Sequence, residues 1–305
     1  MPEKSKNKTS KNNGTKLKYT FKSDVLFKML FRENQHLLKR LISVLLETPL
    51  ESISNFRMTN TEMPPEEIGK KFCRLDINME IDDKLVNLEI QVEDEGNYPD
   101  RALYHFARVY SSSLPAGDDY NALPRTIIIS IIDFALFNCV EVHSEFQVLE
   151  INRHTPLTDK CCLHFLELPK MPGVKQIDLN NEKELWLALF NAETEEELKE
   201  LTQNGGAVMS EAIQAYHGIT ATEEFRSLEW LRAKARHDEA QALSNARKQG
   251  ASQERTHWQG IVANVIADKD AAIADKDAAI ADKDATIADK DATIAQLLAQ
   301  LNNDK

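Results

Sequence analysis

Two kinds of hydrophobic periodicity separate a sheet-forming part of the chain from a helical part. From Ser23, the stretch SDVLFKMLFRENQHLLKRLISVLLE has apolar residues at helical spacing and predicts one amphipathic helix that ends before Pro49. Residues 75–92, LDINMEIDDKLVNLEIQV, alternate between apolar and polar positions and predict a β-hairpin. Residues 98–114 predict another helix, and RTIIISIIDF at 125–134 predicts a strand covered on both faces. Together they predict a βαβ unit, with the last strand parallel to the second hairpin strand.

The rest of the chain changes from short strands to helices. Strand-like runs at 145–151 and 161–168 should extend or cap the sheet, and only helical patterns follow Pro169 and Pro172. The predicted fold class is therefore α/β, with a mixed central sheet flanked by helices, a helical region and a long C-terminal heptad-repeat helix. The expected organisation is a basic tail at 1–18, an α/β domain at 19–170, a helical region at 171–235 and a long charged helix at 236–305.

The C-terminal helix carries four near-identical heptads, ADKDAAI or ADKDATI, from Ala267 to Ile294. An apolar residue recurs every seven positions, as a coiled-coil seam requires, while Lys and Asp occupy the positions three and four residues away. This single apolar row is thin for a seam. A weak homo-oligomer and a merely solvated helix both remain open. The row consists of Ile266, Ile273, Ile280, Ile287, Ile294 and Leu301.

Charge and composition constrain the class of protein without choosing the partner. The net charge of −12 over 305 residues argues against a surface that binds nucleic acid nonspecifically, although a basic patch or bound cations could still serve a polyanion. The lysine-rich first twenty residues could be a solvated tail or an arm that touches phosphate. No apolar stretch is long enough for a signal peptide or a membrane span. The four cysteines lack metal-ligand or disulfide spacing, so we expect a cytoplasmic protein with reduced thiols.

The hairpin places two acidic residues close to the predicted core. If Asp82 and Asp83 form a two-residue loop, facing positions have numbers that sum to 165, and Asp76 lies opposite Glu89 with Cβ atoms about 5 Å apart. Two like charges so placed repel, unless a divalent cation such as Mg²⁺ lies between them or they share a proton. A solvated strand face also commonly carries acids, and a four-residue loop would offset the pair. The pattern therefore permits a metal site without requiring one.

Polar residues near these acids could complete such a site. Gln91 follows Glu89 by two residues, on the same strand face, where its amide could orient a water or a phosphate oxygen. The helix after the hairpin places Arg101, His105 and Arg108 at positions i, i+4 and i+7, on one face. This cationic line could contact phosphates or could simply be a solvated face.

Several of these segments, taken in order, resemble the PD-(D/E)XK nuclease superfamily. They are FKSDVLFKMLF, KKFCRLDINMEIDDKLVNLEIQV, RALYHFARVYSSSL and TIIISII. The most similar branch is the Rpn type, the recombination-promoting nucleases that are also labelled transposases. The resemblance covers residues 19–170 well and the helical remainder more loosely.

This resemblance implies a DNA endonuclease that uses Mg²⁺ or Mn²⁺, with a role in recombination, transposition or phage defence. By motif position, Asp76 and Glu89 match the two metal-binding acids, and the carbonyl oxygen of Ile90 would be a further ligand. Gln91 takes the position of a lysine in the wider superfamily, and Asp24 is similar to an acid that some members bring to the site. Because Gln91 lacks the lysine charge, the alternative is a catalytically weak scaffold that assembles through its C-terminal helix.

Overall fold

The computed structural model describes residues 14–59, 62–63, 73–74 and 76–303. The basic segment up to residue 13, the connector that contains Pro64 and Pro65, and Leu75 lie outside the described residues. The chain forms two compact units, Met1–Arg232 and Ala233–Lys305. In the described part, no helix combines the length and apolar character needed to cross a membrane.

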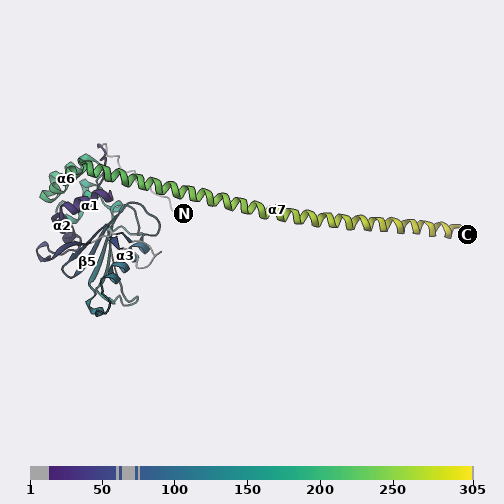
Figure 1. Ribbon diagram of the computed structural model, residues 1–305, viewed down its shortest axis with the longest axis horizontal. Helices are drawn as coiled ribbons and strands as arrows, with labels where there is room; N and C mark the ends of the chain where they lie inside the picture. The colour runs from purple at the N-terminus through teal and green to yellow at the C-terminus, as the bar shows by residue number, and fades with distance from the viewer. Residues whose placement is uncertain (1–13, 60–61, 64–72, 75, 304–305) are drawn as a thin grey trace. The chain divides into compact units, whose positions relative to one another are not determined.

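A six-stranded mixed sheet forms the centre of the first unit (Figure 1). Its strand order is β1-β4-β5-β6-β8-β7, in which β5 pairs in parallel with β6 and β6 with β8, whereas the other three pairs are antiparallel. This confirms the predicted mixed sheet and the parallel pairing of β5 with β6. The strands are β1 (Phe56–Thr59), β4 (Ile77–Ile81), β5 (Lys84–Gln91), β6 (Arg125–Ile132), β7 (His143–Gln147) and β8 (Cys161–Glu167), and β2 (Glu62–Met63) pairs separately with β3 (Cys73–Arg74).

The β4–β5 hairpin has the predicted register. Ile77 pairs with Leu88 and Ile81 with Lys84, so that facing residues sum to 165 and Asp82 and Asp83 form the two-residue loop. Asp82 has φ 50°, in the left-handed region that aspartate tolerates better than most residues. Its carboxylate also accepts hydrogen bonds from the N–H groups of Ser54 and Asn55, at 3.1 and 2.9 Å. The loop length and these contacts fix the register, which in turn fixes the strand positions of the acids.

The first predicted helix is two helices, which corrects the single helix expected from Ser23. These are α1 (Asp24–Glu33) and α2 (Gln35–Leu45), with Asn34 between them at φ −122° and ψ 65°. The Asn34 side chain donates to the carbonyl oxygen of Leu30 at 2.9 Å, a local bond that competes with continuation of the helix. The predicted helix start at Ser23 is confirmed, since its hydroxyl caps α1 by accepting a hydrogen bond from the N–H of Leu26 at 3.2 Å.

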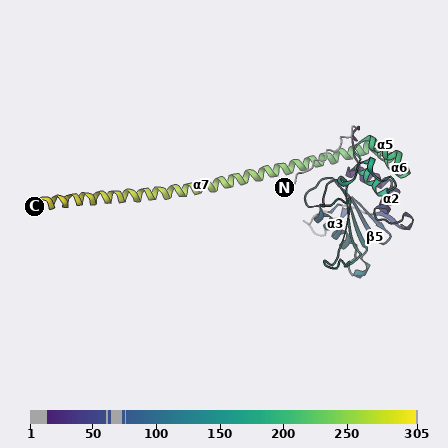
Figure 2. The same ribbon diagram turned by 180° about the vertical axis from the view of Figure 1, so that it is seen from behind.

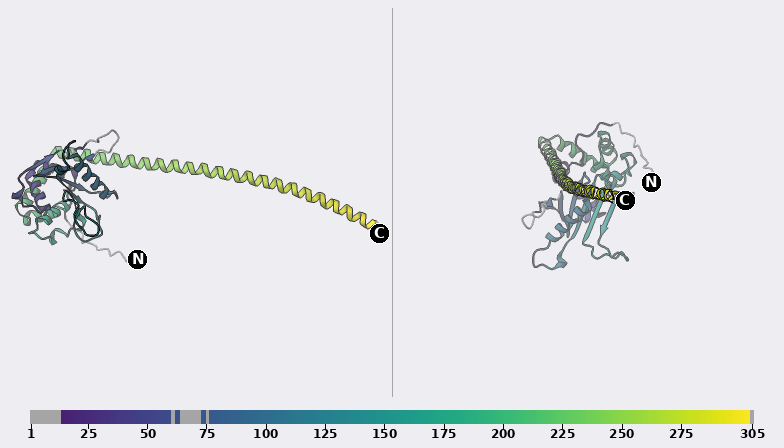
Figure 3. Two further views of the ribbon diagram at one scale, coloured as in Figure 1. Left: turned by 90° about the horizontal axis from the view of Figure 1, so that it is seen from below. Right: turned by 90° about the vertical axis from the view of Figure 1, so that its right-hand side faces the viewer.

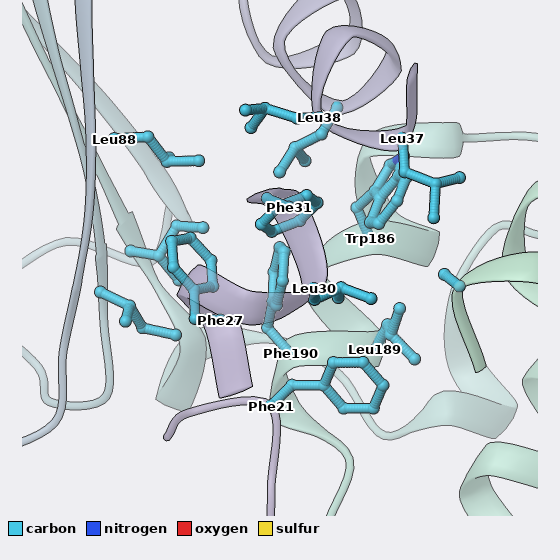
Figure 4. Packing of buried hydrophobic residues seen from close by; sticks show 14 of the residues in the cluster. Phe21, Phe27, Leu30, Phe31, Leu37, Leu38, Leu88, Trp186, Leu189 and Phe190 are labelled. Atoms are coloured by element: carbon cyan, nitrogen blue, oxygen red, sulfur yellow. The ribbon is translucent and has the colours of Figure 1, made fainter. Parts of the chain in front are cut away.

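Helices cover both faces of the sheet (Figure 2). The crossover helix α3 (Tyr98–Ser112) packs through Tyr98 and Ala102 on one face, against Ile128, Ile132 and Phe165. On the other face, α1 and α2 join the α4 helix (Glu182–Asn191) in a larger core. Aromatic rings fill the centre of this core, with Phe31 between Phe27, Trp186 and Phe190 (Figure 4). The interdigitated rings hold α1 firmly against the sheet.

Beyond the sheet, the longer regular elements of the described residues are helices, as the sequence predicts (Figure 3), and Thr194 forms an isolated β-bridge with Lys16. The α4 helix is followed by α5 (Glu195–Asn204), α6 (Gly206–Thr220) and α7 (Glu223–Asn303), and two short 3-10 turns precede α4. The long helix α7 therefore begins at Glu223, earlier than the sequence pattern indicates. Its start belongs to the first unit, where Phe225 is fully buried and packs edge-on against Tyr19.

Candidate functional site

Two carboxylates lie at the open end of the β4–β5 hairpin. Asp76 immediately precedes β4, so that continuation of the Ile77–Leu88 register places it opposite Glu89 of β5. The Asp76 Oδ2 atom accepts a hydrogen bond from the N–H of Ile90 at 3.1 Å, which ties the loop before β4 to the strand that carries Glu89. The Glu89 side chain is 4% exposed and the Asp76 side chain 19%, so both acids are removed from bulk water.

Each acid has its own basic partner from a different element. The Lys28 ammonium of α1 lies 2.8 Å from Asp76 Oδ1, and the His105 Nδ1 atom of α3 lies 2.7 Å from Glu89 Oε1. Because a buried carboxylate is costly unless it is paired and hydrogen-bonded, these contacts explain how the fold tolerates both acids. The site therefore lies where α1, α3 and the hairpin meet.

Two buried hydroxyl groups face the same acids from neighbouring elements. Ser130 of β6 pairs directly with Glu89 in the parallel register, and Tyr98 begins α3. Burial raises the pKa of Tyr98, and the negative charge of Glu89 raises it further, while the nearby Ser130 side chain opposes the shift. Nevertheless, neither hydroxyl has a partner with hydrogen-bond geometry among the residues that the structure describes. Buried hydroxyls without partners are typical of places that take up water or an ion.

The donor set at this place fits a hard divalent cation. Mg²⁺ prefers oxygen ligands and is commonly held by one or two carboxylates together with waters. Asp76 and Glu89 supply the carboxylates, and the Tyr98 and Ser130 hydroxyls could hold waters. The residues present are therefore compatible with the expected Mg²⁺ or Mn²⁺.

On β5, the face that carries Glu89 is buried, although polar residues that alternate with apolar ones commonly mark a solvated strand face. Asn87 is fully buried and Glu89 is 3% exposed, because α3 covers this side of β5. His105 is buried here too, with 7% exposure, and its ring contacts Glu89. The structure thus places His105 against an acid, and its predicted contact with phosphate stays a prediction.

The other predicted site residues lie close by with contacts of their own. Gln91 ends β5 near Asp76 and Glu89, and its side chain donates to the carbonyl oxygen of Glu93 at 2.9 Å. Arg101 lies over the Tyr98 ring at 5.7 Å, partly exposed on α3.

Arg108 and Asp24 complete the predicted set. Arg108 lies two turns after Arg101 on α3 and is also partly exposed. Asp24 lies one turn before Lys28 on α1, but its carboxylate bonds to Arg232 Nε at 2.9 Å. That ion pair accounts for Asp24 structurally, and its participation in the site stays a prediction.

Lys28 is the site residue that sequence reasoning missed. It lies within FKMLF, whose apolar residues Phe27, Leu30 and Phe31 point into the core, and it resembles a helix-surface lysine in that pattern. One signal could have identified it, namely a lysine one turn after Asp24, the acid that resembles a site residue of the family. Its contact with Asp76 joins segments 48 positions apart, a relation that periodicity does not encode.

A mixed sheet flanked by helices, with paired acids at the end of a central hairpin, is the architecture of a PD-(D/E)XK nuclease-like domain. A family model described as PD-(D/E)XK nuclease family transposase matches residues 21–246, and the chain belongs to this family. The match confirms the resemblance seen in the sequence and supports a nuclease- or transposase-like function. No curated protein and no solved structure matches the chain.

Proposed function

We propose that the protein is a metal-dependent DNA endonuclease of the Rpn type that hydrolyses phosphodiester bonds. The observation that carries this proposal is the pairing of Asp76 with Glu89 at one end of the hairpin, each acid held by its own partner. A fold gains no stability from two such acids, whereas a cation site requires them. The family match makes DNA the expected substrate.

In this proposal Asp76, Glu89 and the carbonyl oxygen of Ile90 hold Mg²⁺ or Mn²⁺. When bound, the ion would polarise the scissile phosphate and lower the pKa of an attacking water. The N–H of Ile90 fixes one oxygen of Asp76, and His105 fixes one oxygen of Glu89, so each acid keeps its other oxygen in a defined direction. Metal-binding side chains are generally oriented by hydrogen bonds from neighbouring groups of this kind.

Lys28 supplies the positive charge that the Glu-x-Gln motif lacks. Its ammonium is at the site already, 2.8 Å from Asp76, and a flexible lysine side chain can move from a carboxylate to a phosphate oxygen. Gln91 then has the smaller task of orienting water or phosphate, which an uncharged amide can do. Arg101 and Arg108, partly exposed on α3, would hold the DNA backbone.

The test is plasmid cleavage by the full chain, with and without Mg²⁺ or Mn²⁺. We expect cleavage only with the ion and a loss of at least about 100-fold in Asp76→Asn and Glu89→Gln. Glu80→Gln is a matched control, because Glu80 has the same side-chain orientation on β4 but forms an exposed ion pair with Arg57. If either site variant cuts as fast as the parent, these residues do not carry the reaction.

A second candidate function, of a different class, is self-association through α7. Five isoleucines of the heptad row are 53–56% exposed and form one apolar line along this helix. They are Ile266, Ile273, Ile280, Ile287 and Ile294. If cleavage is weak because Gln91 replaces lysine, the nuclease-like domain would serve as a scaffold that is assembled by this line.

Self-association is tested by measuring the mass of the full chain in solution. Replacement of Ile273 and Ile280 by aspartate should lower the mass of an oligomer, because charge on the apolar row prevents burial. Replacement of Ala271 and Ala278 by aspartate, on the opposite side of the helix, should leave the mass unchanged. A parent chain that is monomeric at high concentration would exclude this function.

A further inference from the structure

A second cluster of metal-binding side chains lies on the edge of the sheet, on the face opposite Glu89. Glu145 of β7 pairs directly with His164 of β8, so both side chains lie on the same face as Cys162. This is the face of the larger core, to which Cys162 belongs. Neighbouring Cys161 points to the other face and belongs to the smaller core under α3. The cluster is therefore separate from the paired acids.

The three side chains direct their donor atoms at one another. The Cys162 thiol donates to Glu145 Oε1, with 3.2 Å between sulfur and oxygen, and lies 3.1 Å from His164 Nε2. One donor atom from each residue falls within 4.8 Å of the other two. Cys162 is fully buried and His164 is 7% exposed, so the sulfur and the imidazole are held by the core, while Glu145 closes the cluster from the surface.

His143 contacts the cluster from outside. Its Nε2 atom lies 2.9 Å from His164 Nδ1, and the two rings stack at 5.1 Å. In the tautomer in which His164 donates its Nδ1–H to His143, the His164 Nε2 atom next to the thiol keeps a free lone pair. Metal-ligating histidines commonly use their second nitrogen in this way. A cavity of about 240 Å³ opens on His143, Glu145 and His164 and gives access from solvent.

We propose that Cys162, His164 and Glu145 form a binding site for Zn²⁺ or a similar divalent transition-metal ion. Zinc bonds of about 2.3 Å to sulfur and about 2.0–2.1 Å to nitrogen and oxygen, in tetrahedral geometry, place neighbouring ligand atoms about 3.3–3.6 Å apart. The observed 3.1 and 3.2 Å separations need only a few tenths of an ångström of expansion. On binding, the thiol loses its proton to solvent, and sulfur, Nε2 and a carboxylate oxygen each donate an electron pair. Water could reach such an ion as a fourth ligand through the cavity that Glu145 and His164 line.

The choice of ion follows from the donor atoms. Thiolate and imidazole favour zinc and its neighbours over Mg²⁺, which prefers the all-oxygen set at Asp76 and Glu89. Arg125 and Lys84 also line the cavity and oppose a cation, but thiolate and carboxylate together neutralise the two charges of the ion. Bound zinc would fasten edge strand β7 to β8.

The experiment uses the full metal-free chain with Zn²⁺, and with Co²⁺ as a spectroscopic substitute. We expect about one tight equivalent of Zn²⁺ and, with Co²⁺, the near-ultraviolet charge-transfer absorption of a cobalt–thiolate bond. Cys162→Ser should abolish this absorption and weaken Zn²⁺ binding at least about 100-fold. Cys161→Ser is the matched control on the adjacent, opposite-facing position and should change neither result.

Two further variants keep the result interpretable. Glu145 is exposed, so the Glu145→Gln variant should fold even if a variant at buried Cys162 does not. This variant should bind Zn²⁺ more weakly, and its cobalt–thiolate absorption should be shifted. Glu89→Gln should retain the site, which separates this ion from the one expected at the paired acids. The proposal is overturned if the parent shows only weak, multiple Zn²⁺ binding, or if Cys161→Ser and Cys162→Ser bind Zn²⁺ equally well.

Discussion

Replacement of Lys28 by methionine should separate metal binding from turnover. The substitution keeps an unbranched apolar stem of similar length but removes the ammonium 2.8 Å from Asp76. Opposite charges about 4 Å apart attract by about 4 kcal/mol at an effective dielectric constant near 20. Because Lys28 is 34% exposed and Asp76 19%, solvent screening and desolvation reduce the net loss of stability to about 1 kcal/mol.

Removal of the ammonium should tighten Mg²⁺ binding and slow turnover. In the parent, Mg²⁺ must displace the Lys28 ammonium from Asp76. Without that competition, we expect the Mg²⁺ concentration for half-maximal rate to fall by about 3- to 10-fold. The maximal rate should fall by about 100- to 1,000-fold, as for loss of one preorganised charged group that faces a reacting phosphate. A lysine that only pairs with Asp76 would leave the maximal rate unchanged at saturating Mg²⁺.

The assay is plasmid nicking over a Mg²⁺ titration, combined with urea denaturation to measure the free energy of unfolding. Arg32→Met is the matched control, because Arg32 lies one turn later on α1, is exposed and also loses one positive charge. An unchanged maximal rate at saturating Mg²⁺ would refute the role proposed for Lys28. A higher Mg²⁺ requirement would show that Lys28 positions Asp76 rather than competing with the ion.

Three other predictions concern groups around the site and in the core. His105→Ala should lower the free energy of unfolding by about 3 kcal/mol in urea denaturation, because it leaves Glu89 buried without its partner; a loss below about 1 kcal/mol would contradict the pairing. Burial raises the pKa of Tyr216 to about 12, so its contribution to stability is complete below pH 10 and is lost between pH 10 and 12. In urea denaturation between pH 10 and 12, the free energy of unfolding of Tyr216→Phe should therefore fall by about 2–3 kcal/mol less than that of the parent. If the two free energies fall in parallel with pH, the raised pKa of Tyr216 is excluded. Phe190→Ala should cost about 3–5 kcal/mol in the same measurement at neutral pH, because Phe190 is fully buried among aromatic rings.

Sequence periodicity predicted the parts of the fold that depend on neighbouring residues. The hairpin register follows from strict alternation and a two-residue loop, because a shift by one position would turn every apolar side chain to the other face. The parallel pairing of β5 with β6 follows from the crossover helix between them, since a connection of that length returns the chain in the same direction. The break at Asn34 was missed because the apolar spacing continues through α1 and α2, whereas the local bond to Leu30 ends the first helix.

The sequence by itself therefore determined which acids face each other, and tertiary packing decided what surrounds them. The local hairpin register places Asp76 opposite Glu89. Packing of α1 then brings Lys28 to Asp76, and packing of α3 buries His105 against Glu89. The second cluster depends likewise on pairing of β7 with β8, which brings Glu145 to a cysteine and a histidine that look like ordinary strand residues in the sequence. The physical reason is range, because alternation and loop length act over a few residues, whereas these contacts depend on how whole helices and strands pack.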